Sequence, residues 1–292
     1  MNERPVQRIG VVGAGTMGSG IAQVAVQSGF EVVLYDIADD ILQRAIERIA
    51  HFIRRAAEKG RITPQEAEAA IARLHTTTSL EDFSTCDFVI EAAPEKLELK
   101  QELFRQLDQI VPDHAVLATN TSTLSVTQIG AATPRPERVV GMHFFNPPPL
   151  MPLVEVAAGA MTSEEAVEAT VELARQLGKT PVRTQDVPGF IVNRVARPFY
   201  LEGLRLLAQG VADHATIDRL VREGGRFRMG PFELMDLIGL DINFAASKSV
   251  YEAYFHEPRY RPSLLQQRMV ESGRLGRKTG RGWYDYGGEE AP

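Results

Sequence analysis

The chain of 292 residues is poor in the features that mark several classes of protein. Its only cysteine is Cys86, so neither an intrachain disulfide nor a cysteine-based zinc site can form, and we expect no metal. Basic residues are not in excess, because 32 Lys and Arg face 38 Asp and Glu and leave a net charge of −6. A mildly acidic chain has no overall electrostatic reason to bind nucleic acid or an anionic membrane. No apolar stretch reaches the roughly 18 residues that a membrane span needs.

The composition that is present is that of a globular protein, with 44% hydrophobic and 24% charged residues. It excludes a disordered or collagen-like chain. Single hydrophobic cores stop growing near this length, so we expect two domains. The first apolar run begins at Ile9 and is broken by glycines, unlike a secretory signal. We therefore expect a cytoplasmic enzyme or binding protein, with a structural protein as the less favoured alternative.

The strongest local signal lies in the first forty residues. A β-rich run over 8–12 leads into Gly13-Ala14-Gly15-Thr16-Met17-Gly18, a helical pattern follows, and a second run over 31–35 ends at Asp36. In this context the first glycine permits a tight turn, the second lets the backbone approach a pyrophosphate, and the third lets the helix pack close to the strand. Asp36 can accept hydrogen bonds from an adenosine ribose and would repel a 2′-phosphate, which favours NAD over NADP. A βαβ unit without a ligand is the alternative.

The rest of the chain divides into an α/β part and a helical part. An amphipathic helix is expected around 42–53, and Thr63-Pro64 begins a second helix that we expect to run through Leu74. The exposed face of this hairpin is basic, and is either a solvated surface or a patch for an anionic ligand tail. After Pro188 strand patterns nearly vanish. We predict a Rossmann-type, mostly parallel sheet with a helical hairpin insertion over residues 1–186, followed by a smaller all-α domain over 187–292.

One histidine stands where a catalytic base is expected. Oxidation of an alcohol by NAD needs a proton acceptor, and only His143, among six histidines, ends a predicted strand on the side where α/β sheets bind ligands. A proline-rich turn short enough to join antiparallel strands separates it from the next strand, which carries Glu155. We expect pairing to place this carboxylate beside the imidazole, where it fixes the ring tautomer and stabilises the imidazolium. The alternative is that both are strand-edge polar residues with local partners.

Two further polar residues occupy positions where ligand contacts are common. Ser122 lies in a run of hydroxyls and an amide over 119–123, after the strand 115–118, and these groups are either helix caps or ligand contacts. Asn193 interrupts an apolar helix start after the domain boundary, and a buried amide needs a protein partner or a substrate to hold. The apolar positions of this helix go almost all round, which predicts burial within a domain or against a second chain.

Taken together, the motifs and polar residues described above resemble those of the L-3-hydroxyacyl-CoA dehydrogenase family, of the short-chain 3-hydroxybutyryl-CoA type. The resemblance runs from Ile9 to Tyr286 and is carried by the glycine motif, Asn120-Thr121-Ser122, and the blocks 141–147, 188–194 and 229–234. It implies NAD-dependent oxidation of (S)-3-hydroxyacyl-CoA to 3-ketoacyl-CoA, as in fatty-acid β-oxidation. It also implies a homodimer that forms through the helical domain.

The resemblance implies a role for each matching residue. His143 is similar to the general base of the family and Glu155 to its electrostatic partner, while Ser122 and Asn193 match groups that hold the 3-hydroxyl or the thioester region. Cofactor contacts of the family match the residues from Gly13 to Gly18 together with Asp36, Glu95, Lys100, Asn120, Ser122, Asn146 and Lys278. Substrate contacts of the family match Lys59, Lys100, Ser122 and Asn193.

Several alternatives stay open at this point. Phe52 lies where some relatives have a small hydroxyl residue near CoA, which leaves the details of the CoA contact open. The acyl group is not fixed by the sequence, and 3-hydroxyadipyl-CoA or a free hydroxy or sugar acid are alternative substrates on the same scaffold. A non-catalytic NAD-binding structural protein is the third alternative. Lys59 on the basic hairpin favours a CoA thioester, and the intact set of Ser122, His143, Glu155 and Asn193 favours an enzyme.

Overall fold

A computed structural model describes residues 6–287, and the outermost residues of both expected domains lie outside this range. The chain divides into two compact units after Val187. Each unit has a hydrophobic core of its own. None of the helices within residues 6–287 is long and apolar enough to span a bilayer.

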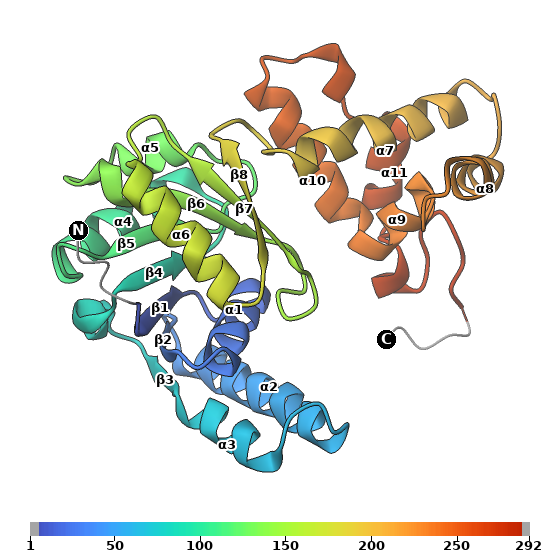
Figure 1. Ribbon diagram of the computed structural model, residues 1–292. Coiled ribbons are helices and arrows are strands. Elements are labelled where there is room, and N and C mark those ends of the chain that lie inside the picture. The colour runs from blue at the N-terminus through green and yellow to red at the C-terminus, as the bar shows by residue number, and fades with distance from the viewer. Residues whose placement is uncertain (1–5, 288–292) are drawn as a thin grey trace. The chain divides into compact units, whose positions relative to one another are not determined.

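The first unit is built on an eight-stranded sheet with the strand order β3-β2-β1-β4-β5-β6-β7-β8 (Figure 1). Neighbouring strands are parallel except for β6 and β7. The central strands are short and buried along their whole length, as parallel strands covered on both faces should be. The Rossmann-type sheet that the sequence predicts is confirmed. The strands are β1 (Arg8–Val12), β2 (Glu31–Tyr35), β3 (Leu74–Thr77), β4 (Phe88–Glu91), β5 (Val116–Thr119), β6 (Val139–Phe144), β7 (Leu153–Ala158) and β8 (Thr180–Gln185).

Helices of the first unit fall into two packing groups (Figure 1). One group buries its apolar residues in a common core with the strands, and comprises α1 (Thr16–Gln27), α2 (Asp39–Glu58), α3 (Pro64–Ala72) and α6 (Glu164–Gln176). The other group, α4 (Leu97–Ile110) and α5 (Val126–Gly130), packs together beside β5 and β6. Two 3₁₀ turns, η1 (Leu80–Thr85) and η2 (Pro136–Arg138), complete the unit.

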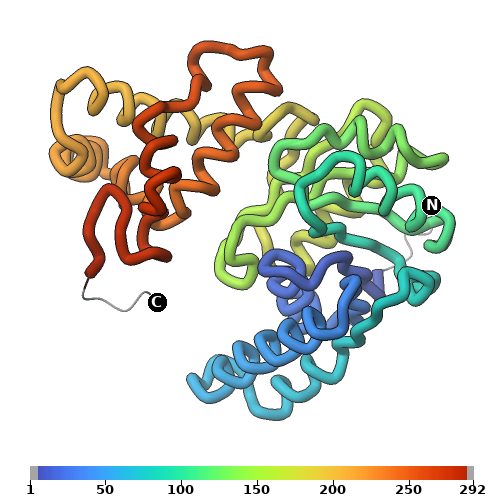
Figure 2. Tube along the Cα trace, turned by 180° about the vertical axis from the view of Figure 1, so that it is seen from behind, coloured from blue at the N-terminus to red at the C-terminus, as the bar shows by residue number. Residues whose placement is uncertain are grey.

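The helical hairpin lies at the β3 edge of the sheet, next to α1 (Figures 1 and 2). Its second helix begins as predicted, with a capping box between Thr63 and Glu66 and a proline in the first turn. It ends at Ala72, so the expectation of a helix through Leu74 is wrong. Leu74 instead begins β3, because pairing with Val32 and its neighbours on β2 supplies backbone hydrogen bonds along the whole segment.

The second unit is helical, with an extended piece near its end that pairs only through isolated bridges at Arg281. Its core joins α7, α8, α9 and α10 through residues such as Leu204, Ile217 and Phe232. The helix α7 is not covered all round within the chain, because Val195 is 68% exposed. The elements are α7 (Val192–Ala208), α8 (His214–Gly225), α9 (Pro231–Ile238), α10 (Leu240–Ala253), η3 (Pro258–Tyr260), α11 (Leu264–Glu271) and η4 (Arg277–Thr279).

Candidate functional site

The three glycines between the end of β1 and the first turn of α1 differ in the space around them. A Cβ atom on Gly13, where φ is +97°, would lie 2.8 Å from the backbone oxygen of Ala92, and one on Gly18 would lie 1.7 Å from the oxygen of Gly13. A Cβ on Gly15 would meet nothing within 4 Å. The fold therefore requires glycine at positions 13 and 18. At position 15 the absent side chain leaves open space over the start of α1, whose first turn has no side-chain cap.

Two charged side chains fix this loop from outside. Asp36, directly after β2, accepts hydrogen bonds from the backbone N–H of Ala14 at 2.7 Å and of Ile37 at 2.8 Å. Arg48 of α2 donates from Nη2 to Ser19 Oγ at 2.6 Å and to the backbone oxygens of Ala14 and Gly15 at 3.3 Å. The basic composition of the hairpin gives no sign that Arg48 has this particular role. Its loop contacts join positions 29 to 34 residues apart, which no local pattern indicates.

His143 and Glu155 lie directly opposite each other in the antiparallel pair of β6 and β7. Both are buried, and His143 Nδ1 lies 2.9 Å from Glu155 Oε2. A carboxylate only accepts, so Nδ1 carries the proton and Nε2 is the basic nitrogen of the neutral ring. Ser122 Oγ lies 3.2 Å from that nitrogen. The structure therefore brings together three of the four residues that the sequence analysis named as catalytic.

Glu95 organises the loop that carries Ser122. Its Oε1 atom accepts hydrogen bonds from Thr121 Oγ1 and from the backbone N–H groups of Ser122, at 2.9 Å, and Thr123, at 3.2 Å. Desolvation opposes ionisation of Glu95, but the charge of Lys100 and these hydrogen bonds outweigh it and hold the pKa of the carboxyl below its ordinary value. The carboxylate form, which all three donors need, is therefore the form present near neutral pH.

A buried ion pair between Lys100 and Glu91 lies next to Glu95. Lys100 is 1% exposed, and its Nζ lies 2.6 Å from Oε1 of the fully buried Glu91 and 3.4 Å from Glu95 Oε2. Glu91 also accepts from Thr119 Oγ1 and from the backbone N–H of Ala93. Sequence reasoning missed Glu91, although an acidic residue that ends an apolar strand on the ligand side of the sheet is a usable signal. The contacts of Lys100 are those of a residue that positions Glu95.

The remaining candidates are spread over both units. In the first unit, Asn120 Oδ1 accepts from the backbone N–H of Phe144 at 2.8 Å, whereas Asn146 and Lys59 are exposed at the ends of β6 and α2. In the second unit, Asn193 is half-buried in the first turn of α7. Lys278 Nζ lies 2.6 and 2.7 Å from the two carboxylate oxygens of Asp241.

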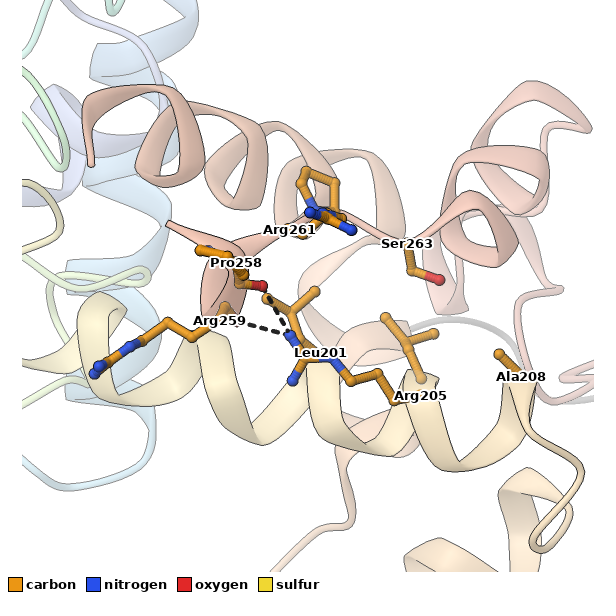
Figure 3. A pocket seen from close by; sticks show the side chains of 9 residues that line it. Leu201, Arg205, Ala208, Pro258, Arg259, Arg261 and Ser263 are labelled. Carbon is orange, nitrogen blue, oxygen red and sulfur yellow. Dashed lines mark hydrogen bonds between the residues drawn. The ribbon is translucent and has the colours of Figure 1, made fainter. Parts of the chain in front are cut away.

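A pocket of about 520 Å³ in the second unit contains none of these candidates (Figure 3). It lies between α7 and the segment 258–263. Arg205 donates from Nη2 to the backbone oxygens of Pro258 and Arg259, as the dashed lines show, and pairs with Glu202 at 2.9 Å. Since these contacts already engage Arg205, we assign it the role of tying the segment to α7.

Comparison with known proteins decides the family. The NAD binding domain of 3-hydroxyacyl-CoA dehydrogenase matches residues 8–187, and the C-terminal domain of the same family matches residues 189–286. The chain belongs to the 3-hydroxyacyl-CoA dehydrogenase family. The resemblance drawn from the motifs is thereby confirmed, as are the dehydrogenase class of the family and NAD as the cofactor of its first domain. The open space at Gly15 and the carboxylate of Asp36 fit the pyrophosphate and the ribose of NAD.

Individual relatives carry names that differ in the acyl group. The chain is 49% identical to 3-hydroxyadipyl-CoA dehydrogenase of Escherichia coli over 97% of its own length and 60% of that protein. It is 43% identical to 3-hydroxybutyryl-CoA dehydrogenase of Mycobacterium tuberculosis, over 96% of this chain and 99% of that one. A crystal structure of 3-hydroxybutyryl-CoA dehydrogenase from Escherichia coli K12 superposes with a TM-score of 0.95 at 48% identity, over 98% of this chain and 61% of that one. The chain thus spans about 60% of the length of the Escherichia coli relatives it matches.

Substitution of two glycines should separate folding from cofactor binding. Gly18→Ala is expected to lower the free energy of unfolding by about 3 kcal/mol, because its Cβ overlaps the backbone of Gly13. Gly15→Ala is expected to leave that free energy within about 0.5 kcal/mol and to weaken NADH binding at least tenfold. Denaturant unfolding and isothermal titration with NADH measure the two effects. Equal NADH affinity in Gly15→Ala and the parent protein would exclude a pyrophosphate at this position.

Removal of the buried cation should destabilise the first unit. Lys100→Met is expected to cost about 3–5 kcal/mol of unfolding free energy, because it leaves the Glu91 carboxylate buried without its counter-ion. The double variant Glu91→Gln/Lys100→Met should recover part of that loss. Lys96→Met, on an exposed lysine of the same segment, is the matched control and should change stability little. A double variant less stable than Lys100→Met would contradict this account.

Proposed function

We propose that this chain oxidises (S)-3-hydroxyacyl-CoA to 3-ketoacyl-CoA with NAD, with 3-hydroxybutyryl-CoA as its short-chain substrate. The observation that carries the proposal is the placement of His143 between buried Glu155 and Ser122. A histidine held by a carboxylate, with a hydroxyl at its basic nitrogen, is suited to proton exchange with an alcohol. The glycine loop that fits NAD belongs to the same sheet.

The proposed mechanism assigns one task to each group. The glycine loop and Asp36 would hold NAD, which would supply the acceptor for the hydride from C3 of the substrate. His143 Nε2 accepts the proton of the 3-hydroxyl, and Glu155 stabilises the imidazolium that forms. Ser122 Oγ, 3.2 Å from Nε2, holds the substrate oxygen on the line of proton transfer. In the reverse direction His143 returns the same proton to the 3-keto oxygen.

The other candidates have roles in binding under this proposal. Asn193 holds the thioester or the 3-hydroxyl, and Lys59, exposed directly after α2, meets a phosphate of CoA. Glu95 and Lys100 act through the loop of Ser122 on the cofactor side of the site. The remaining proposed cofactor contacts are Asn120, Asn146 and Lys278.

A homodimer through the helical unit is part of the proposal. Val195, Leu220 and Ile242 of this unit are each more than half exposed. We propose that a second copy of the chain covers these side chains of α7, α8 and α10. We also infer a cytoplasmic location.

The acyl group has two candidates with support from relatives. The Mycobacterium tuberculosis relative is named for 3-hydroxybutyryl-CoA and the Escherichia coli relative for 3-hydroxyadipyl-CoA. NADH production with each thioester, and with the matching free 3-hydroxy acids, tests the substrate class. Turnover of the free acids alone would replace the CoA thioester in this proposal, and no NADH with any of them would favour a non-catalytic NAD-binding protein.

Replacement of the base should remove turnover without loss of the fold. His143→Ala is expected to lower kcat with 3-hydroxybutyryl-CoA by about 10²–10⁴-fold, the usual contribution of a positioned base. NADH binding, measured by titration, should stay within about threefold, which is the control for folding. A variant that keeps near-normal kcat would show that another group accepts the proton.

Replacement of Asp36 should change the choice of cofactor. Asp36→Asn keeps an oxygen for the N–H of Ala14 but removes the negative charge, so binding of NADP should improve relative to NAD by tenfold or more. Asp36→Ala also removes the hydrogen-bond acceptor and should weaken NAD as well. The ratio of the dissociation constants for NADH and NADPH measures both effects, and an unchanged ratio would show that another group excludes the 2′-phosphate.

A further inference from the structure

The second unit contains a buried cation without an acidic partner. Arg197 of α7 is 3% exposed, and within residues 6–287 no carboxylate lies within ion-pair distance of its guanidinium. Its Nη1 donates to the backbone oxygen of Asn243 at 2.9 Å and to Ser247 Oγ at 3.2 Å, and its Cζ atom lies over the ring of Tyr200, 4.9 Å from the ring centre. Buried charges in proteins are normally paired, so this arrangement needs an explanation.

The surroundings of Arg197 contain unused hydrogen-bond donors. Arg197 Nε and Asn243 Nδ2 are buried without a partner. Gln266 Nε2 donates to Asn243 Oδ1 at 2.8 Å. If both side-chain amides were turned over, the direction of this hydrogen bond would reverse. In either orientation one of the two NH₂ groups donates to the other amide and the second NH₂ group remains without a partner. Gln266 Oε1, a third buried atom without a partner, is an acceptor and needs a donor such as water. A guanidinium edge and an amide NH₂ are the groups that bind a carboxylate.

The position of Arg197 along α7 relates it to the substrate. It follows Asn193 by four residues, so the two side chains are neighbours on one face of the helix, about 6 Å apart at Cβ. Asn193 holds the thioester or the 3-hydroxyl under the proposed function. In a six-carbon acyl chain with a terminal carboxylate, three carbon–carbon bonds of about 1.5 Å each separate C3 from that carboxylate. With Asn193 on the 3-hydroxyl, the terminal carboxylate would therefore lie within about one helical turn of it, which is the separation of Asn193 and Arg197 along α7.

We propose that Arg197 binds a carboxylate at the far end of the acyl chain, so that the enzyme prefers an ω-carboxylated six-carbon 3-hydroxyacyl-CoA to the uncharged chain of equal length. This inference rests on the proposed function and adds to it a residue that determines the substrate class. The name of the Escherichia coli relative, 3-hydroxyadipyl-CoA dehydrogenase, agrees with a substrate of this kind. Arg197 acts on binding and specificity, and takes no part in proton or hydride transfer.

The test compares three thioesters on the full chain. The ratio kcat/KM is measured with 3-hydroxyadipyl-CoA, 3-hydroxyhexanoyl-CoA and 3-hydroxybutyryl-CoA. The parent protein should prefer the adipyl over the hexanoyl thioester at least tenfold, the factor expected for hydrogen bonds to a charged group. Arg197→Met should abolish that preference, mainly through a higher KM for the adipyl thioester, and leave kcat/KM for 3-hydroxybutyryl-CoA within about threefold. Arg197→Lys should keep part of the preference.

Two further variants keep the test decisive. Arg219→Met, the same substitution on an exposed arginine of α8, is the matched control and should retain the preference. Ser247→Asp places a carboxylate beside the guanidinium, since Ser247 Oγ lies 3.2 Å from Arg197 Nη1. This internal counter-ion should raise the thermal midpoint and also abolish the preference for the adipyl thioester. Ser247→Asp therefore tests the inference even if Arg197→Met fails to fold.

Each contrary outcome has a distinct meaning. Oxidation of 3-hydroxybutyryl-CoA without a preference for the adipyl thioester would overturn the inference and leave the proposed function intact. A preference that survives Arg197→Met, or an equal loss with all three thioesters, would assign Arg197 a structural role. A change of oligomeric state in Arg197→Met, measured by light scattering, would assign its counter-ion to a second copy of the chain. Failure of the parent protein with every thioester would overturn the proposed function as well.

Discussion

The candidate site depends on one exception in an otherwise parallel sheet. β6 and β7 run antiparallel, and no other neighbouring pair among the strands of residues 6–287 does so. Residues directly opposite in such a pair have Cβ atoms about 5 Å apart, so the register alone puts Glu155 beside His143. The alternating residues of both strands, Met142 and Val156 among them, lie in the core. A slip of one residue would move Val154 and Val156 out of this core and put Glu155 into it, and the core therefore enforces the pairing of base and carboxylate.

A chain of polar contacts extends this pairing across the first unit. Glu155 bonds to His143, which meets Ser122, whose backbone N–H donates to Glu95. Lys100 then joins Glu95 to the buried Glu91. Strands β4, β6 and β7, the loops after β4 and β5, and helix α4 contribute to this network. Nearly every polar group of the network has a partner of opposite charge or a fixed donor. Such a network holds Ser122 and His143 in one arrangement before any substrate arrives, so less reorganisation is left for the reaction.

The elements that depend on local periodicity or fixed spacing could be predicted from the sequence. The parallel sheet, the glycine loop and the antiparallel strands around the proline-rich turn all follow from short-range patterns. The turn predicts that the strands of His143 and Glu155 are neighbours, and packing of the core sets the register that pairs the two residues. The elements and contacts that depend on segments far apart in the sequence could not be predicted. The edge strand at Leu74 forms only because β2 is present, and the contacts of Arg48, Glu91 and Arg197 depend on tertiary packing. A lysine such as Lys100 can be placed near a site by resemblance, but its burial against Glu91 requires the structure.

Lys100 and Arg197 are both buried cations, but they differ in how the cost of burying a positive charge is compensated. Lys100 has a buried carboxylate as its partner, so its charge is compensated by the protein itself. Among the residues that the structure describes, the contacts of Arg197 are neutral, namely a backbone oxygen, a hydroxyl and an aromatic face. Neutral acceptors stabilise a guanidinium less than a carboxylate does, and a well-packed apolar residue would serve stability at least as well at this position. Under the proposed function Arg197 lies one helical turn from the substrate-binding residue Asn193, and the proposed carboxylate of the acyl chain would be the counter-ion that the described residues do not supply.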